Sequence, residues 1–261
     1  MSDRYETAME QMRENCQRDL PWFVAGDYAD GADLVVVAGG PSVRTRLDAI
    51  RDRQKRGAKV MACNGARKLL HANGIIPDAV AMLDMSEDVL GFLDGYDDNA
   101  LYLIASIVHP SVLDALAGKH VLVWHCDYGE GRTKDQADIL DDHPDRPGSL
   151  IGGGNTIGVR AMNLGFLMGF KHLHYYGLDS SFADDGADHA YIKHSGQEPE
   201  SVTIQHNGNS YRCSPWMAKQ AWEFEYYYRQ FTNAGMKITL HGEGLIPDIW
   251  RSIRIRQRLA A

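Results

Sequence analysis

The sequence predicts an α/β protein of Rossmann-like architecture, with a mostly parallel sheet flanked by helices. Three observations support this fold class. Short apolar runs alternate along the chain with segments of helical periodicity, the pattern of βαβ units joined by right-handed crossovers. The first run, 34–37 (LVVV), has the length and β-branching of a strand buried on both faces. Small or polar residues follow several of these runs, and ligands bind beyond the carboxyl ends of the strands in such sheets.

Composition excludes several classes of protein. The chain has 261 residues, 44% hydrophobic and 24% charged, as in a soluble globular domain. A net charge of −8 argues against nucleic acids and anionic membranes as partners. We expect no membrane span and no signal peptide, since no apolar run is long enough and the N-terminus is polar. Four scattered cysteines without a CxxC pair predict no disulfide framework and favour the cytoplasm.

The first half of the chain is expected to hold five strands. A helical lead-in occupies 1–30, and Pro21 and Gly26 interrupt it. Ser42 could cap the helical run that follows the first strand. Asn73 and Gly74 close a later helix, with glycine in its usual place after a helix end. After the strand 34–37, the expected elements are helix 43–56, strand 59–64, helix 66–72, strand 79–83, strand 101–107, helix 110–117 and strand 120–125.

The second half continues the alternation with two interruptions. Residues 128–148 are rich in Asp, Gly and Pro and are expected to form a long, mobile loop, and the polar segment 180–214 is the second interruption. The remaining elements are helix 157–168, strand 172–176, helix 215–233, strand 237–241 and a basic amphipathic helix after Pro247. We divide the chain into the lead-in 1–30, a single nucleotide-binding catalytic domain 31–250 and a basic helix end 251–261.

Two glycine-rich turns at strand or helix ends are candidate phosphate sites. One contains Gly39, Gly40, Pro41 and Ser42, and the other contains Gly153, Gly154, Asn155 and Thr156. Backbone N–H groups at such turns attract anions. Tight turns also use glycine for steric reasons alone, so this alternative stays open for both.

Three polar residues at strand ends are further binding candidates. Asn64 could hydrogen-bond a base or ribose, or satisfy its own turn. Asp84 could hold a ribose hydroxyl or a metal ion, or cap the next helix. Asp179 follows a buried strand, where a carboxylate is costly unless paired, and could bind a ligand or orient a loop.

His189, Tyr191 and His194 cluster in the polar segment and are the candidate catalytic residues. Histidine titrates in the range that general base catalysis near neutral pH needs, and a tyrosine hydroxyl can hold a leaving phosphate. Solvated loop residues are the alternative. The aromatic run at 216–228 is interpreted as core and helix packing, and the arginines at 251–258 as a solvated helix face.

Several segments in order resemble a known group: the central domain of motility accessory factor (Maf) flagellin glycosyltransferases and the 6-hydroxymethylpterin pyrophosphokinase MptE-like proteins. The matching segments are AGGPS (38–42), HANGIIPDAVAMLD (71–84), GGGNTIGVRAMNLGFLMGFKHLHYYGLDSSF (152–182), DHAY (188–191) and HGEGLIPDI (241–249). The resemblance runs from about residue 33 to residue 249 and implies a nucleotide-binding fold.

A more distant similarity is to bacterial sialyltransferases that use a CMP donor. The shared features are GPS after the first strand (40–42), Asn64 after the second, a Thr-x-Gly at 156–158, a Gly-x-Asp at 177–179 and YIKHS (191–195). In that comparison His194 corresponds to the catalytic base. Two positions depart from that pattern: Gly39 stands where those enzymes carry asparagine, and Phe182 where a tyrosine is expected.

The resemblance implies a cytoplasmic enzyme that transfers a sugar, of the nonulosonic or sialic type, from a CMP-activated donor to an acceptor hydroxyl. The nucleotide sugar is then a co-substrate, and the acceptor is a protein or a glycan. One alternative is an ATP-dependent pterin-type pyrophosphokinase, the one case in which Mg²⁺ is expected. Asp84 is followed by Met85 and Ser86, without a second aspartate two residues on that could help to hold Mg²⁺, which argues against the kinase alternative. The other alternative is a non-catalytic nucleotide-binding module. Metal ligands and oligomeric state are left open.

Overall fold

The structure, a computed structural model, describes residues 2–93, 95, 99–129, 133–191 and 200–259. Its centre is an eight-stranded sheet in the order β10-β7-β1-β2-β3-β4-β5-β6, in which every neighbouring pair is parallel. The strands are β1 (Leu34–Val37), β2 (Lys59–Cys63), β3 (Ala79–Met82), β4 (Leu101–Ala105), β5 (Val121–Cys126), β6 (Leu150–Ile151), β7 (His172–Tyr176) and β10 (Lys237–His241). The predicted α/β, Rossmann-like fold is confirmed.

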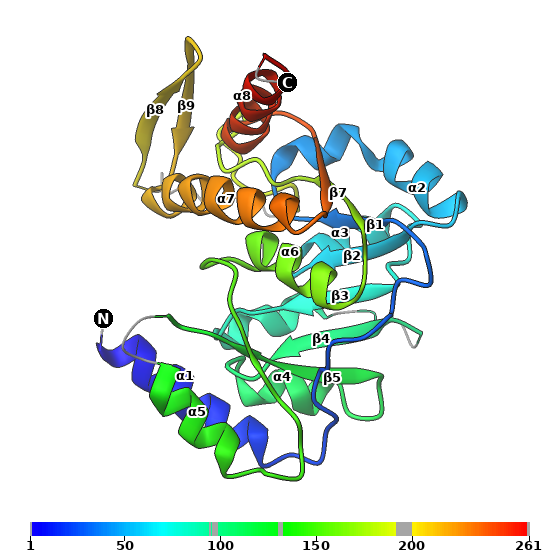
Figure 1. The fold of residues 1–261 in the computed structure, drawn as a ribbon, viewed down its shortest axis with the longest axis vertical. Coiled ribbons are helices and arrows are strands. Elements are labelled where there is room, and N and C mark those ends of the chain that lie inside the picture. The colour runs from blue at the N-terminus through cyan, green and yellow to red at the C-terminus, as the bar shows by residue number, and fades with distance from the viewer. Residues whose placement is uncertain (1, 94, 96–98, 130–132, 192–199, 260–261) are drawn as a thin grey trace.

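Helices cover both faces of the sheet. They are α1 (Ser2–Cys16), α2 (Leu47–Lys55), α3 (Ala66–Ala72), α4 (Pro110–Ala115), α5 (Thr133–Asp141), α6 (Ile157–Leu167), α7 (Pro215–Asn233) and α8 (Leu245–Leu259), with 3-10 helices η1 (Pro41–Thr45) and η2 (Glu87–Phe92). The long helix α7 lies across α6, and α1 lies beside α5 at the opposite end of the molecule (Figure 1).

The alternation of side chains along β1 separates two cores. Val35 and Val37 pack with Ile50 of α2 and Leu70 of α3, while the neighbouring residues of β1 face α6. On α6, Ala161 and Leu164 are fully buried. A Cβ at Gly165 would lie 3.1 Å from Leu34 Cδ2, so this glycine lets α6 approach the sheet closely.

The strand order reverses between β1 and β7. From β1 the chain builds the sheet outward to β6, then returns to place β7 on the other side of β1. Crossovers that run in opposite directions from such a point leave a crevice beyond the carboxyl ends of the two strands. The fold therefore predicts the place of a ligand site.

The expected loop at 128–148 is wrong in part, because α5 forms inside this segment and β6 follows it directly. Gln136 is fully buried, accepts a hydrogen bond from the Tyr128 N–H at 2.9 Å and donates to the Cys126 carbonyl. The Tyr5 hydroxyl of α1 donates to Asp135 at 2.9 Å. Contacts with distant segments thus stabilise a helix whose sequence is rich in loop-forming residues.

The polar segment 180–214 contains an antiparallel hairpin that the sequence reading missed. Strands β8 (Val202–His206) and β9 (Asn209–Cys213) flank Asn207 and Gly208, both at positive φ. Asn-Gly is the strongest short hairpin signal, so this turn was predictable. The hairpin projects beyond α7, beside α8 (Figure 1).

Three helix expectations also need correction. The run after β1 is a 3-10 helix, η1, followed by α2, and its N-cap is Gly40 without a side-chain cap. Ser42 lies inside η1, and its hydroxyl donates a hydrogen bond to Asp179 instead of capping a helix. The last helix begins at Leu245, before Pro247, and runs unbroken through residue 250. The division of the chain at residues 30 and 250 stays a prediction.

The aromatic run in α7 divides between core and surface. Phe224 and Tyr228 are buried as expected, whereas Trp222 is 79% exposed and Tyr226 is also exposed. All four cysteines are free and buried. Among the helices of the described ranges, none has both the length and the apolar composition needed to cross a membrane.

Candidate functional site

A cavity of about 830 Å³ lies beyond the carboxyl ends of the strands, at the reversal of strand order. The ends of β1, β2, β3, β5 and β7 contribute to it, together with the first turn of α6 and one side of α7. Most of the predicted site residues line it: Gly39, Gly40, Asn64, Asp84, Gly153, Gly154, Asn155, Thr156, Asp179, His189 and Tyr191. Pro41 and Ser42 lie outside the lining, and His194 lies outside the described residues.

The first turn is held by backbone contacts between β1 and β7. The Gly40 N–H donates to the Gly177 carbonyl at 2.7 Å, and the Ala38 N–H to the Tyr176 carbonyl at 2.8 Å. A Cβ at Gly40 would lie 2.6 Å from both the Gly177 oxygen and the Asp179 carboxyl. Steric fit therefore explains this glycine, because the chain segments that follow β1 and β7 meet at Gly40 and leave no room for a side chain.

Asp179 binds Ser42. The carboxylate accepts the Ser42 N–H at 2.7 Å and the Ser42 hydroxyl at 2.6 Å. Burial raises the pKa of Asp179 to about 6, although these two hydrogen bonds favour the charged form. The contact is the loop-orienting role expected as one alternative, and it explains why Ser42 neither caps a helix nor reaches the cavity.

The second turn combines a helix N-terminus with an unpartnered amide. Thr156 is the N-cap of α6, and its hydroxyl accepts the Val159 N–H at 3.4 Å. Gly153 and Gly154 both have positive φ, which glycine adopts without strain. Asn155 Oδ1 and Nδ2 are buried and have no hydrogen-bond partner in the described part of the chain. Such groups are rarely left unpaired in proteins, and a bound ligand would satisfy them.

A carboxylate already contacts this turn. Glu223 of α7 accepts the Asn155 N–H at 3.0 Å and lies 3.7 Å from the Lys219 ammonium. The turn thus binds an anion, here one supplied by the chain itself. A neighbouring network joins α7 to the N-cap of α6 and to the segment after β7. Gln220 of α7 donates to the Thr156 hydroxyl at 2.6 Å and accepts from the Ser180 hydroxyl at 2.7 Å.

The segment that carries His189 and Tyr191 is bound directly over the first turn. The Ala190 N–H donates to the Gly39 carbonyl at 2.8 Å, and Arg44 donates to the carbonyls of His189 and Ala190 at 3.0 and 3.2 Å. A Cβ at Gly39 would lie 2.8 Å from the Tyr191 hydroxyl and from His189 Cδ2. The glycine at this position therefore admits both candidate catalytic side chains.

The two side chains have suitable chemical settings. His189 Nδ1 lies 3.0 Å from an Asp188 carboxylate oxygen, but among the described residues it has no partner in hydrogen-bond geometry, so Asp188 acts on the ring through its charge. Burial raises the pKa of the Tyr191 hydroxyl, so it stays protonated and can donate. The His189 side chain is partly exposed.

Asn64 and Asp84 lie at the ends of β2 and β3. Asn64 adopts a left-handed backbone with φ 46°, a strained conformation that is common at binding sites, and its Oδ1 accepts the Leu83 N–H at 3.4 Å. Asp84 accepts the Ser86 N–H at 3.1 Å. Ser86 is the N-cap of η2, so Asp84 does not cap that helix.

Other lining residues were missed by the sequence reading. They are Arg4 and Tyr5 of α1, Asp127 and Tyr128 after β5, Arg160 of α6, and Trp216, Lys219, Gln220, Glu223 and Tyr227 of α7. Asp127 follows a buried strand, as Asp84 and Asp179 do, so the same signal could have found it. The residues of α1 and α7 carry no such signal, because only the tertiary fold brings them to the cavity.

Comparisons with known proteins agree with this fold. A family model described as 6-hydroxymethylpterin diphosphokinase MptE-like matches residues 6–185. A solved structure of the MAf glycosyltransferase from Magnetospirillum magneticum AMB-1 is similar, with a TM-score of 0.65 and 18% sequence identity. The match covers 92% of this chain and 38% of that chain. No curated protein matches the sequence. The resemblance to Maf and MptE-like proteins is confirmed, and the solved structure shows the shared fold.

The substitution Gly40→Ala tests the close approach of β1 and β7. The added methyl group would meet the Asp179 carboxyl and the Gly177 oxygen, and overpacking of this kind costs about 1–3 kcal/mol. Urea denaturation should show that loss of unfolding free energy. Gly152→Ala is the matched control in the same cavity, because its Cβ would meet nothing within 4 Å. Equal stability of the two variants would contradict the expectation.

The substitution Asp179→Asn tests the pKa of the buried carboxyl. A folded-state pKa of about 6, above the ordinary pKa of an aspartate near 3.8, means that ionisation destabilises the fold as pH rises from about 4 through 6. Each pKa unit corresponds to about 1.4 kcal/mol, so the wild type should lose about 3 kcal/mol relative to Asp179→Asn over that range. Urea denaturation of both proteins from pH 4 to 7 measures it. A constant difference would disprove the raised pKa.

Proposed function

Because the chain belongs to the family of 6-hydroxymethylpterin diphosphokinase MptE-like proteins, we propose that it is a transferase whose cavity binds a nucleotide-activated sugar. In this proposal a sugar of the nonulosonic type passes from a CMP-linked donor to an acceptor hydroxyl on a protein or glycan. The observation that carries the binding step is the unpartnered Asn155 amide beside the α6 N-terminus. The fold shared with the MAf glycosyltransferase supports sugar transfer over other chemistries.

The donor would be held mainly by backbone groups. The N-terminus of α6 and the amides of Gly153–Thr156 favour a phosphate, and the carboxamide of Asn155 offers both a donor and an acceptor. Asn64 and Asp84 lie at the neighbouring strand ends, where they could hydrogen-bond the base and the ribose. The single phosphate of a CMP donor is also the leaving group, so in this proposal it lies between the α6 N-terminus and the Tyr191 hydroxyl, and His189 faces the acceptor.

The catalytic step needs a base and stabilisation of the leaving group. His189, whose Nδ1 lies 3.0 Å from the Asp188 carboxylate, would take the proton of the acceptor hydroxyl as that oxygen attacks the anomeric carbon. The bond from that carbon to the phosphate oxygen breaks, and the Tyr191 hydroxyl donates to the departing phosphate. General base catalysis contributes roughly 10²–10⁴-fold. Electrostatic stabilisation of the leaving group contributes more in many enzymes.

The description of the matching family favours a second function, diphosphoryl transfer from ATP. Mg²⁺ commonly uses one or two carboxylates together with the nucleotide phosphates, and Asp84 and Asp127 both line the cavity. Within the described ranges, the only group of three candidate ligand atoms that lie within 4.8 Å of one another is elsewhere. The two functions differ in the nucleotide bound and in the need for metal.

A thermal-shift panel of CMP, CDP, UDP, ATP and a pterin, each with and without Mg²⁺, separates the two functions. We expect CMP and CDP to raise the melting temperature without Mg²⁺. A ligand at 100 times its dissociation constant stabilises the folded state by about 2.7 kcal/mol. Stabilisation by ATP with Mg²⁺ alone would support the kinase instead. A panel without any shift would support a non-catalytic module.

The variant His189→Gln tests the proposed base. We expect the rate constant for transfer to fall roughly 10²–10⁴-fold, while the thermal shift caused by CMP is retained. His120→Gln is the matched control, since His120 is exposed at the start of β5. Transfer by His194→Ala, assayed in parallel, tests the other histidine. An unchanged rate in His189→Gln would remove His189 from the mechanism.

A further inference from the structure

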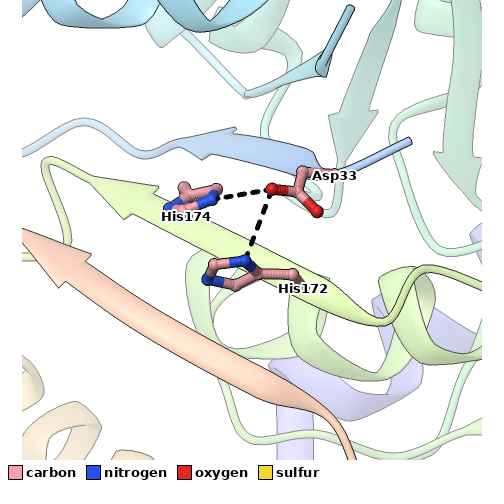
Figure 2. Close-up of side chains that lie close together, drawn as sticks. All are labelled: Asp33, His172 and His174. Carbon is pink, nitrogen blue, oxygen red and sulfur yellow. Dashed lines mark hydrogen bonds and ion pairs between the residues drawn. The ribbon is translucent and has the colours of Figure 1, made fainter. Parts of the chain in front are cut away.

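A cluster of polar side chains lies on the α2 face of the sheet, at the opposite end of β1 from the cavity. Asp33 directly precedes β1, and His172 and His174 are alternate residues of β7, so they point to the same face. Figure 2 shows one oxygen of the Asp33 carboxylate facing a ring nitrogen of each histidine, with a dashed line to both. Nothing in the proposed transferase mechanism uses these residues.

The three ligand atoms have the spacing of a metal site. Asp33 Oδ2 lies 3.1 Å from His174 Nε2 and 3.3 Å from His172 Nδ1, and all three atoms lie within 4.8 Å of one another. Metal–ligand bonds of about 2.0–2.1 Å in a tetrahedron place neighbouring ligand atoms about 3.3 Å apart. We propose that Asp33, His172 and His174 bind a divalent transition-metal ion of the Zn²⁺ class.

The second nitrogen of each imidazole has a partner. His174 Nδ1 lies 3.2 Å from His241 Nε2, and His172 Nε2 lies 3.0 Å from the Thr239 hydroxyl. Metal-binding histidines commonly use their other nitrogen in this way, which fixes the ring orientation and the tautomer. Both partners belong to β10, so three adjacent strands build the site.

The site is open to solvent on one side. The Asp33 side chain is 45% exposed, whereas that of His174 is 5% exposed. An ion can therefore arrive over the carboxylate and keep water as its fourth ligand.

Arg53 at the end of α2 is the cation that competes for this place. Its Nη1 lies 3.1 Å from His174 Nε2 and its Nη2 lies 3.4 Å from His241 Nε2, while its Nε donates to the Tyr176 hydroxyl at 2.9 Å. A metal ion on His174 Nε2 displaces the guanidinium from that nitrogen. Removal of Arg53 should therefore strengthen metal binding.

Titration of the full chain with Zn²⁺ by calorimetry, and with Co²⁺ by visible absorption, tests the site. We expect one equivalent of Zn²⁺ to bind, and one equivalent of Co²⁺ to give the intense absorption of a four-coordinate ion. Asp33→Asn and His172→Ala should each weaken binding by at least the 10–100-fold typical for loss of outer-shell partners. Arg53→Ala should bind Zn²⁺ more tightly than the wild type.

Matched controls are Asp30→Asn, an exposed aspartate in the preceding turn, and His120→Ala; both should bind as the wild type does. Zn²⁺ should also raise the melting temperature of the wild type and not that of Asp33→Asn. A wild type that binds no Zn²⁺ overturns the proposal. Equal affinity in the wild type, Asp33→Asn and His172→Ala also overturns it. Because these measurements need no nucleotide or acceptor, their failure is independent of the proposed transferase activity.

Discussion

The parallel pairing of β1 with β7 is the contact on which the rest of the molecule depends. Their register aligns Leu34 with Leu173 and Val37 with Tyr176, so both strands end at the same level. A Cβ at Gly177 would lie 2.6 Å from the Ala38 carbonyl oxygen, which shows how closely the two backbones continue beyond the sheet. Asp179 then returns to Ser42. The floor of the cavity follows from this pairing, and the helices α6 and α7 form its walls.

Sequence patterns were sufficient where local chemistry decides the structure. Seven strands and both glycine turns were predictable, because a buried parallel strand is a continuous apolar run and its turn needs small residues. They were insufficient where tertiary contacts decide. Helix α5 depends on the burial of Gln136, and Arg4 and Glu223 reach the cavity from helices far apart in the sequence. Neither kind of contact leaves a periodic signal in the chain.

The site was predictable as a group of residues better than as a set of roles. Strand-end reasoning grouped Asn64, Asp84 and Asp179, which line one cavity, since carboxyl ends of parallel strands share one edge. The sequence pattern could not show that the Asp179 carboxylate accepts hydrogen bonds from Ser42, because that contact joins residues 137 positions apart. The same limit applies to Gly39 and Gly40, whose small size is explained by what packs on them. A sequence pattern locates such residues, but their roles follow only from their contacts in the folded structure.

The electrostatics of the cavity favour recognition by backbone amides. Asp84, Asp127 and Glu223 line it, and the buried Arg160 is hydrogen-bonded to the carbonyls of Ile151 and Asp127. A phosphate therefore meets few available cations among the described residues, and the α6 N-terminus is the main source of positive potential. Glu223 shows that this source already holds a carboxylate. In the proposed function, a phosphate at this N-terminus would compete with the Glu223 carboxylate for the Asn155 N–H.

The two faces of β7 carry different chemistry because its side chains alternate between them. Leu173 and Tyr175 fill the core on one face, while His172 and His174 lie on the face that α2 covers. An apolar residue at position 174 would pack there without the desolvation cost of a buried imidazole. Asp33, Arg53 and His241 all contact this ring, and together they satisfy both of its nitrogens. Four polar residues from four elements are a costly way to fill this space, and the proposed metal site gives that cost a function.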